Sequence, residues 1–239
     1  MLEAIKKQFQ VQWKDYGIWG ALIVTGVWFI GCIVFNIMLA NKDETTYIEL
    51  GTIMGCSVII MMGIFTAMLQ IRINFNIEVS MGCTRLRFFT SFYIVNVVMN
   101  ALMVLLLILL CAAERGIYGM IFPGIKEEAD IMRWILRLAV SLALAGPMIG
   151  GFSGSLVMRF GQKAFWAVWA VWMLLCIGTP RIIDAAKDAP QSLFGMIGKG
   201  VLQILNVLPV DGWIIAGTAA SLLCCIGSWL MLRRQQVTM

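Results

Sequence analysis

Six long runs of the chain contain no charged residue, and they predict its organisation. The runs are 17 to 26 residues long and fall at 16–41, 50–71, 88–113, 138–158, 164–180 and 212–232. A bilayer core of about 30 Å needs about 20 helical residues, and a helix satisfies its backbone polar groups within one segment. The pattern predicts an all-α integral membrane protein with six transmembrane helices, forming a single transmembrane domain over residues 1–239.

The segment before the first run has the periodicity of an amphipathic helix. Apolar residues recur every three or four positions, while basic and amide residues take the other side. The apolar positions are Leu2, Ile5, Phe9, Trp13 and Tyr16, and the polar ones are Lys6, Lys7, Gln10 and Lys14. Residues 1–16 are therefore predicted to form an interfacial helix on the anionic lipid of the inner leaflet. The alternative is an ordinary soluble docking helix.

Residues 72–87 form the longest predicted connection on the side of the two termini. Within it, residues 74–81 have the composition of a short helix that ends at Gly82. We expect this helix to lie parallel to the membrane, where a soluble partner can dock. The alternative is a solvated connector that carries basic charge.

Two segments are predicted on the opposite side of the membrane. Residues 181–211 hold two apolar stretches, 189–198 and 200–210, each too short to cross a bilayer. They predict an outer re-entrant or interfacial helical hairpin before the sixth span. Residues 114–137 are more polar and predict a small exposed lid.

The distribution of charge predicts the orientation. Ten basic residues fall on the side of the two termini, opposed there only by Glu3, Asp15 and Glu78, which leaves 8 of the 18 basic and 10 of the 13 acidic residues for the other side. Because short cytoplasmic loops are enriched in Lys and Arg, both termini are predicted in the cytoplasm of a multi-pass cell-membrane protein. The net charge of +5 is attributed to this orientation and not to nucleic acid.

The amino-acid composition indicates a membrane protein and excludes several kinds of catalytic and metal site. Hydrophobic residues make up 61% of the chain and charged residues 13%, where soluble domains have about 25% charged residues. There is no histidine, which excludes His-based triads, His-ligated metals and His proton relays. The seven cysteines include no pair in a loop, so neither a disulfide framework nor a CxxC metal site is indicated.

Two stretches are similar to enzyme motifs, but each lacks a feature that the motif needs. Residues 127–133 have the form EExxxxR, one residue longer than the motif of intramembrane CAAX-type proteases, which also need histidines. Residues 146–154 read GPMIGGFSG, which lacks the lysine of a phosphate-binding loop. Gly146, Gly150 and Gly154 share one helix face there, a pattern typical of close helix packing. The chain is therefore expected to have no enzymatic activity and no cofactor of its own.

Two groups of polar and aromatic residues inside the runs each have two alternative roles. Asn96 and Asn100 share a helix face and are candidates to line a translocation path, with hydrogen bonding between helices as the alternative. Trp166, Trp169 and Trp172 form a stripe that faces lipid or a second subunit, or else contacts an amphiphilic substrate. Since the runs contain no charge, any energy source for transport is expected outside this chain.

The stretch at 75–89 resembles a loop of the permease subunits of ABC exporters of the type-2 branch. It reads FNIEVSMGCTRLRFF, similar to the family form F-N-x-x-x-S-M-G-x-(S/T)-R-(K/R)-x-(F/Y)-(F/Y), with Leu86 and Arg87 in swapped order. Arg159-Phe160-Gly161 before the tryptophan-rich run is a second, weaker match. The layout of the whole chain is also similar to that family.

The resemblance implies that the loop is a coupling helix that docks into a groove of an ATP-binding cassette. Glu78 and Arg85 would then supply ion pairs, and Val79 and Met81 the apolar contact. The implied docking residues are Asn76, Glu78, Val79, Ser80, Met81, Gly82 and Arg85.

The implied assembly contains two ATP-binding cassette subunits, which carry ATP and Mg²⁺, and a second permease subunit, identical or different. The implied function is alternating-access export of a peptide, an antibiotic or a lipid-like compound. The alternatives are a passive channel or facilitator, and a membrane sensor or immunity protein for an antimicrobial peptide.

Overall fold

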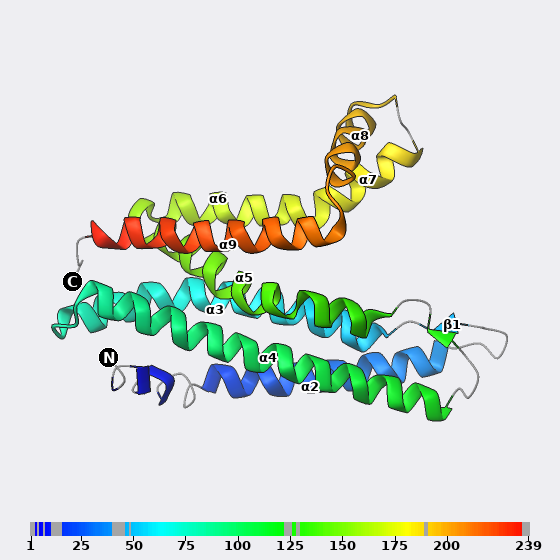
Figure 1. Cartoon of the computed structure of the whole chain (residues 1–239), viewed down its shortest axis with the longest axis horizontal. Helices are drawn as coiled ribbons and strands as arrows, with labels where there is room; N and C mark the ends of the chain where they lie inside the picture. Colours follow the sequence, from blue (N-terminus) through cyan, green and yellow to red (C-terminus); the bar gives the residue numbers. More distant parts are fainter. Residues whose placement is uncertain are drawn as a thin grey trace.

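The computed structural model describes residues 3, 5–6, 8–10, 16–39, 46–47, 49–121, 126–127, 130–188 and 191–235. Almost all of them are helical, and the long helices lie side by side in one elongated bundle (Figure 1). The helices are α2 (Tyr16–Leu39), α3 (Leu50–Ser80), α4 (Arg85–Ile121), α5 (Ile131–Phe160), α6 (Gln162–Met173), α7 (Thr179–Asp188), α8 (Leu193–Leu205) and α9 (Val210–Arg233). A π-helical turn, η1 (Leu174–Gly178), joins α6 to α7. Two-residue strands β1 (Thr46–Tyr47) and β2 (Lys126–Glu127) pair in parallel.

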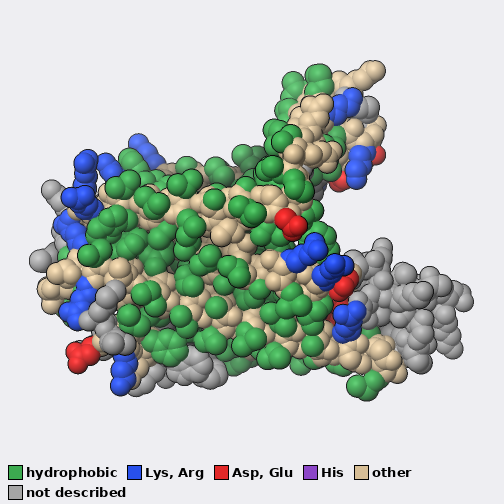
Figure 2. Space-filling view, in the orientation of Figure 1, with side chains coloured by type: hydrophobic (Ala, Val, Ile, Leu, Met, Phe, Trp, Pro, Cys, Tyr) green, Lys and Arg blue, Asp and Glu red, His purple; other side chains and the backbone are tan. Residues whose placement is uncertain are grey.

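Among the described residues, four helices are long and apolar enough to cross a membrane: α3, α4, α5 and α9. Their outer surface is covered with apolar side chains, which form the broad green belt of Figure 2. Because exposed apolar area of this extent is unfavourable in water, the chain is an all-α, multi-pass membrane protein. The prediction of an all-α membrane fold is confirmed at this level.

The two ends of the bundle differ in charge. Lys and Arg side chains gather at the left end in Figure 2, where α3 and α5 end and α4 and α6 begin. We call this the basic end. It includes Arg85, Arg87, Arg159, Lys163 and Arg233. The opposite, far end carries acidic and basic residues together.

The first and fifth predicted spans differ from the other four. Helix α2 is 24 residues long and covers most of the first charge-free run. The fifth run was expected to end at Pro180, and this is wrong: α6, η1 and α7 follow one another without a gap as far as Asp188. Pro180 is the second residue of α7 and lies directly after the π-helical turn η1, so the irregular turn coincides with the proline.

The predicted outer hairpin corresponds to α7 and α8, which pack against each other and project away from the bundle (Figure 1). A Cβ added at Gly198 would collide with the carbonyl of Ile182 and with Ala186, so glycine permits this close approach. The two predicted apolar stretches are not separate, since α8 continues through Gly198 and Gly200.

The N-terminal segment is described only at Glu3, Ile5–Lys6 and Gln8–Gln10, and all of these residues are helical. Ile5 and Phe9 are half-buried, Gln8 is buried, and Lys6 and Gln10 are exposed, so the amphipathic character of the segment stays a prediction. The predicted positions Leu2, Lys7, Trp13 and Lys14 lie outside the described residues.

Helices α3 and α5 make the closest contact in the bundle. Gly63 of α3 lies against Gly146 of α5, where an added Cβ would be 3.3 Å from the Gly146 Cα. Further along the crossing, Gly150 lies against the backbone of Ile64, and Gly154 against that of Met68. The predicted packing role of this glycine face is thus what the structure shows.

Candidate functional site: a helical hairpin at the basic end and a buried carboxylate network

The predicted docking segment is the tip of a hairpin between α3 and α4. Helix α3 runs without interruption from Leu50 to Ser80, so the expected separate helix over 74–81 is wrong. None of the residues Arg72, Asn74 or Glu78 breaks a helix, and the next glycine after Gly63 is Gly82. The chain reverses over Met81–Thr84, and α4 begins at Arg85.

Gly82 closes α3 with a Schellman motif. Its φ of 87° lies in the left-handed region, which favours glycine. The N–H of Gly82 donates to the carbonyl of Val79 at 3.1 Å, and that of Cys83 donates to the carbonyl of Glu78 at 3.0 Å. The prediction that Gly82 ends the helix is confirmed.

The tip is packed onto the bundle by aromatic residues. Phe75 of α3 meets Phe88 of α4 edge to face with ring centroids 5.4 Å apart, and Phe88 stacks on Phe92 at 5.7 Å. All three rings are fully buried, and Val79 and Cys83 pack against the cluster they form. Burial raises the pKa of the Cys83 thiol. The tip is therefore a rigid extension of the core.

The seven predicted docking residues are not equally available to a partner. Val79 packs on the core of its own chain, whereas Met81 is 80% exposed. The Arg85 guanidinium donates to the carbonyl of Arg233 at 2.5 Å, so it caps the end of α9. Asn76 and Glu78 are half-buried, while Ser80 and Gly82 are exposed beside Met81. The accessible surface of the tip is centred on Met81.

A carboxylate network lies at the opposite end of α3. Glu114 of α4 is fully buried, and its carboxylate accepts hydrogen bonds from the backbone N–H of Gly51 at 2.9 Å and of Thr52 at 2.8 Å. The hydroxyls of Thr52 and Tyr118 donate to it at 2.7 and 3.1 Å. Glu114 thereby satisfies N–H groups of the first turn of α3, next to the positive end of the helix dipole.

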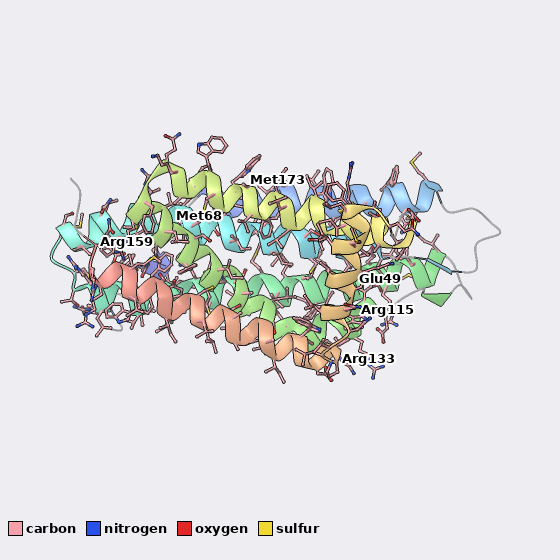
Figure 3. All side chains as sticks on the ribbon, turned by 90° about the horizontal axis from the view of Figure 1, so that it is seen from above. Glu49, Met68, Arg115, Arg133, Arg159 and Met173 are labelled. Carbon is pink, nitrogen blue, oxygen red and sulfur yellow. The ribbon has the colours of Figure 1, made fainter. Side chains whose placement is uncertain are left out.

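The network extends to α2 and to the residue that precedes α3. The Asn36 amide donates to the Tyr118 hydroxyl at 2.9 Å, which joins α2 to α4. The Cys111 thiol donates to the carboxylate of Glu49 at 3.4 Å, and both residues are buried. Figure 3 places Glu49 at the end of the bundle opposite Arg159. Three helices are thus joined through two buried carboxyl groups.

The network was missed by the count of charge-free runs. That count assigned Glu114 to an exposed lid, and this expectation is wrong because its side chain is fully buried. One signal was available in the sequence: Cys111, Glu114 and Tyr118 recur at helical spacing on one face of α4. A carboxyl group on such a face is directed into the bundle.

The two asparagines predicted for a translocation path are both buried. The Asn100 amide donates to the carbonyls of Leu142 and Ala143 on α5, at 2.8 and 3.2 Å. The Asn96 amide donates to the carbonyl of Phe92 on its own helix at 2.9 Å. Asn100 thus makes the hydrogen bond between helices that was the alternative, and the role of both residues in a pathway stays a prediction.

Comparison with known proteins finds no match: no family model, no curated protein and no solved structure is similar to this chain.

Proposed function

We propose that the chain is the membrane-spanning subunit of an ATP-driven exporter of the ABC type, in the type-2 branch. In this proposal α2, α3, α4, α5, α6 with η1, and α9 cross the cell membrane, and the basic end faces the cytoplasm with both termini. The N-terminal helix lies on the inner leaflet, and α7 and α8 lie at the outer surface. The substrate is a peptide, an antibiotic or a lipid-like compound.

The observation that carries the proposal is the exposed tip of the α3–α4 hairpin. Met81 is 80% exposed and Leu86 57% exposed on either side of Gly82, at the basic end of the bundle. Two apolar side chains on a charged, rigid projection suit insertion into a groove of a soluble partner. Positive charge at this end favours the cytoplasmic side, where an ATP-binding cassette is present.

The packing behind the tip supports a mechanical role. Met81 directly follows α3, and the buried rings of Phe75, Phe88 and Phe92 fix the tip to both helices. A push on the tip is then transmitted along α3 and, through the glycine crossing, to α5. Such movement would switch the bundle between inward and outward access.

The energy comes from partner subunits in this proposal. The sequence has no GxxxxGK[ST] loop, so ATP and Mg²⁺ bind to two cassette subunits, and this chain itself is not an enzyme. A second permease subunit, identical or different, completes the pathway.

The test uses two methionines with matched exposure. Met81 is 80% exposed at the hairpin tip, and Met120 is 81% exposed near the far end of α4. The tagged chain is purified in mild detergent at endogenous expression, and the co-purifying proteins are identified. We expect a stoichiometric protein with a GxxxxGK[ST] loop that is retained by Met120→Asp and lost from Met81→Asp.

Other outcomes separate the rival functions. Recovery of no ATPase with the unaltered chain would exclude the exporter and favour a passive channel or a sensor. Equal retention by both variants would show that the cassette docks away from Met81. Val79→Asp is not a useful test, because Val79 packs on the core of this chain.

A further inference from the structure

An apolar groove lies between α3, α5 and α6 on the side of the bundle. Its volume is about 410 Å³, within the range of about 300–1,000 Å³ of small-molecule sites. Apolar side chains make up nearly all of its lining, among them Met68 of α3, Phe152 of α5 and Trp169 and Trp172 of α6. The groove exists because α6 makes its main bundle contacts with α5, among the described residues, and leaves space beside α3.

The groove has the length of one membrane leaflet. On α6 and η1 its lining extends from Phe165 to Leu175. At a rise of 1.5 Å per residue this is about 15 Å, half of a bilayer core of about 30 Å. Figure 3 places Met68 and Arg159 towards the same end of the bundle, so the groove lies in the leaflet at the basic end.

Each of the three helices that line the groove carries a basic residue at that end. Arg72 follows Met68 by one turn of α3, and Arg159 follows the lining residue Leu156 by three positions on α5. Lys163 precedes the lining residue Phe165 on α6. All three basic side chains are exposed, and within the described part of the chain none of them forms an ion pair.

We propose that the groove binds one acyl chain of an anionic phospholipid from this leaflet, with the lipid phosphate held by Arg72, Arg159 and Lys163. The apolar lining suits a hydrocarbon chain, and its length of one leaflet suits a chain that ends at the bilayer midplane. The basic rim selects a headgroup with net negative charge, since zwitterionic lipids are the common alternative in a bilayer.

A helix of a second copy is the rival occupant of the groove, and the experiment below distinguishes the two. An acyl chain is thinner than a helix, which is about 10–12 Å wide, and it enters from the side without separation of the helices.

Native mass spectrometry of the tagged, purified protein tests the proposal. The protein is titrated with dioleoyl phosphatidylglycerol or dioleoyl phosphatidylcholine, and the retained lipid is counted. Ala167→Phe fills the groove, and Ala170→Phe is its control, because Ala170 is exposed on the same helix and does not line the groove. Arg159→Gln with Lys163→Gln removes basic charge at the rim, and Arg133→Gln with Arg137→Gln removes it at the far end.

We expect the unaltered protein to retain one phosphatidylglycerol in preference to phosphatidylcholine. Ala167→Phe and the rim double variant should each weaken this binding about tenfold or more, while both controls bind as the unaltered protein does. Equal retention of the two lipids, or unchanged binding in Ala167→Phe, would overturn the proposal. A dimer that only Ala167→Phe disrupts would also overturn it, by identifying a second copy as the occupant. None of these outcomes depends on whether an ATPase co-purifies.

Discussion

Glu114 shows how a single carboxyl group can be placed inside a helical membrane protein. A buried carboxylate is costly unless it is hydrogen-bonded. Here it accepts four hydrogen bonds, two from backbone N–H groups of α3 and two from hydroxyls. The same N–H groups would have no partner within α3, because they belong to its first turn. The Glu114 side chain therefore gains the hydrogen bonds that its burial requires and at the same time supplies partners to the N–H groups of α3.

Glu114→Gln should lower the stability of the bundle by about 2–3 kcal/mol. One of the two oxygens becomes an NH₂ group, which is a donor and faces donors that it cannot satisfy. Thermal unfolding of the purified protein in detergent measures the effect. Asp211→Asn is the control, because Asp211 is exposed in the first turn of α9. Equal shifts in the two variants would show that the network contributes no more than a surface charge.

At the scale of the elements, the close packing of α3 on α5 depends on glycines, which have no side chain. Gly63, Gly146, Gly150 and Gly154 let the two backbones meet, and the Asn100 amide closes the contact from α4. Within a membrane there is no hydrophobic driving force between helices, so close packing and hydrogen bonds must hold them together. A methyl group added at any of these four glycines would force the two helices apart.

Gly150→Ala and Gly119→Ala should change stability in opposite directions. A Cβ at Gly150 would overlap the carbonyl of Ile64 and the Cβ of Ala67, whereas at Gly119 it meets nothing within 4 Å. We expect Gly150→Ala to destabilise the bundle by about 1–3 kcal/mol. Gly119→Ala should stabilise it by up to about 1 kcal/mol, because alanine is the better helix former. Thermal unfolding and recovery of monodisperse protein measure both, and destabilisation by Gly119→Ala would contradict the packing argument.

The sequence predicts the helices better than it predicts their ends. Charge-free runs locate α3, α4, α5 and α9 because the bilayer excludes charge. They underestimate α3, which continues through Arg72 and Glu78, because helix continuity depends on backbone hydrogen bonds and not on polarity. The site is predicted less well. Glu114 looks like part of an exposed lid until the fold brings Thr52 within hydrogen-bond distance, 62 positions away along the chain.

For the whole molecule, the chain enters and leaves the bundle at one end. Helix α2 begins and α9 ends at the basic end, where the N and C labels lie in Figure 1. The α7–α8 pair lies at the far end, beyond the apolar belt. The proposed topology, with an even number of crossings and both termini in the cytoplasm, requires this arrangement.

Reporter fusions should show opposite sides for the C-terminus and for the start of α8. A fluorescent protein that folds only in the cytoplasm should be active after Met239. Alkaline phosphatase, active only outside the cytoplasm, should be active when fused after Ser192. Activity of alkaline phosphatase after Met239 would reverse the proposed orientation. Inactivity after Ser192 would place the α7–α8 connection in the cytoplasm and contradict six spans.

Because α3 is one unbroken helix, a small tilt at one of its ends displaces the other end by a large distance. Its 31 residues make a rod of about 46 Å, held at one end by the Glu114 carboxylate and ending at the other beside Met81. A tilt of about 5° about the held end moves the other end by about 4 Å, about three-quarters of a helical turn. A small angular change at the far end thus corresponds to a displacement at the basic end as large as a side chain, with no hinge in α3 to absorb it.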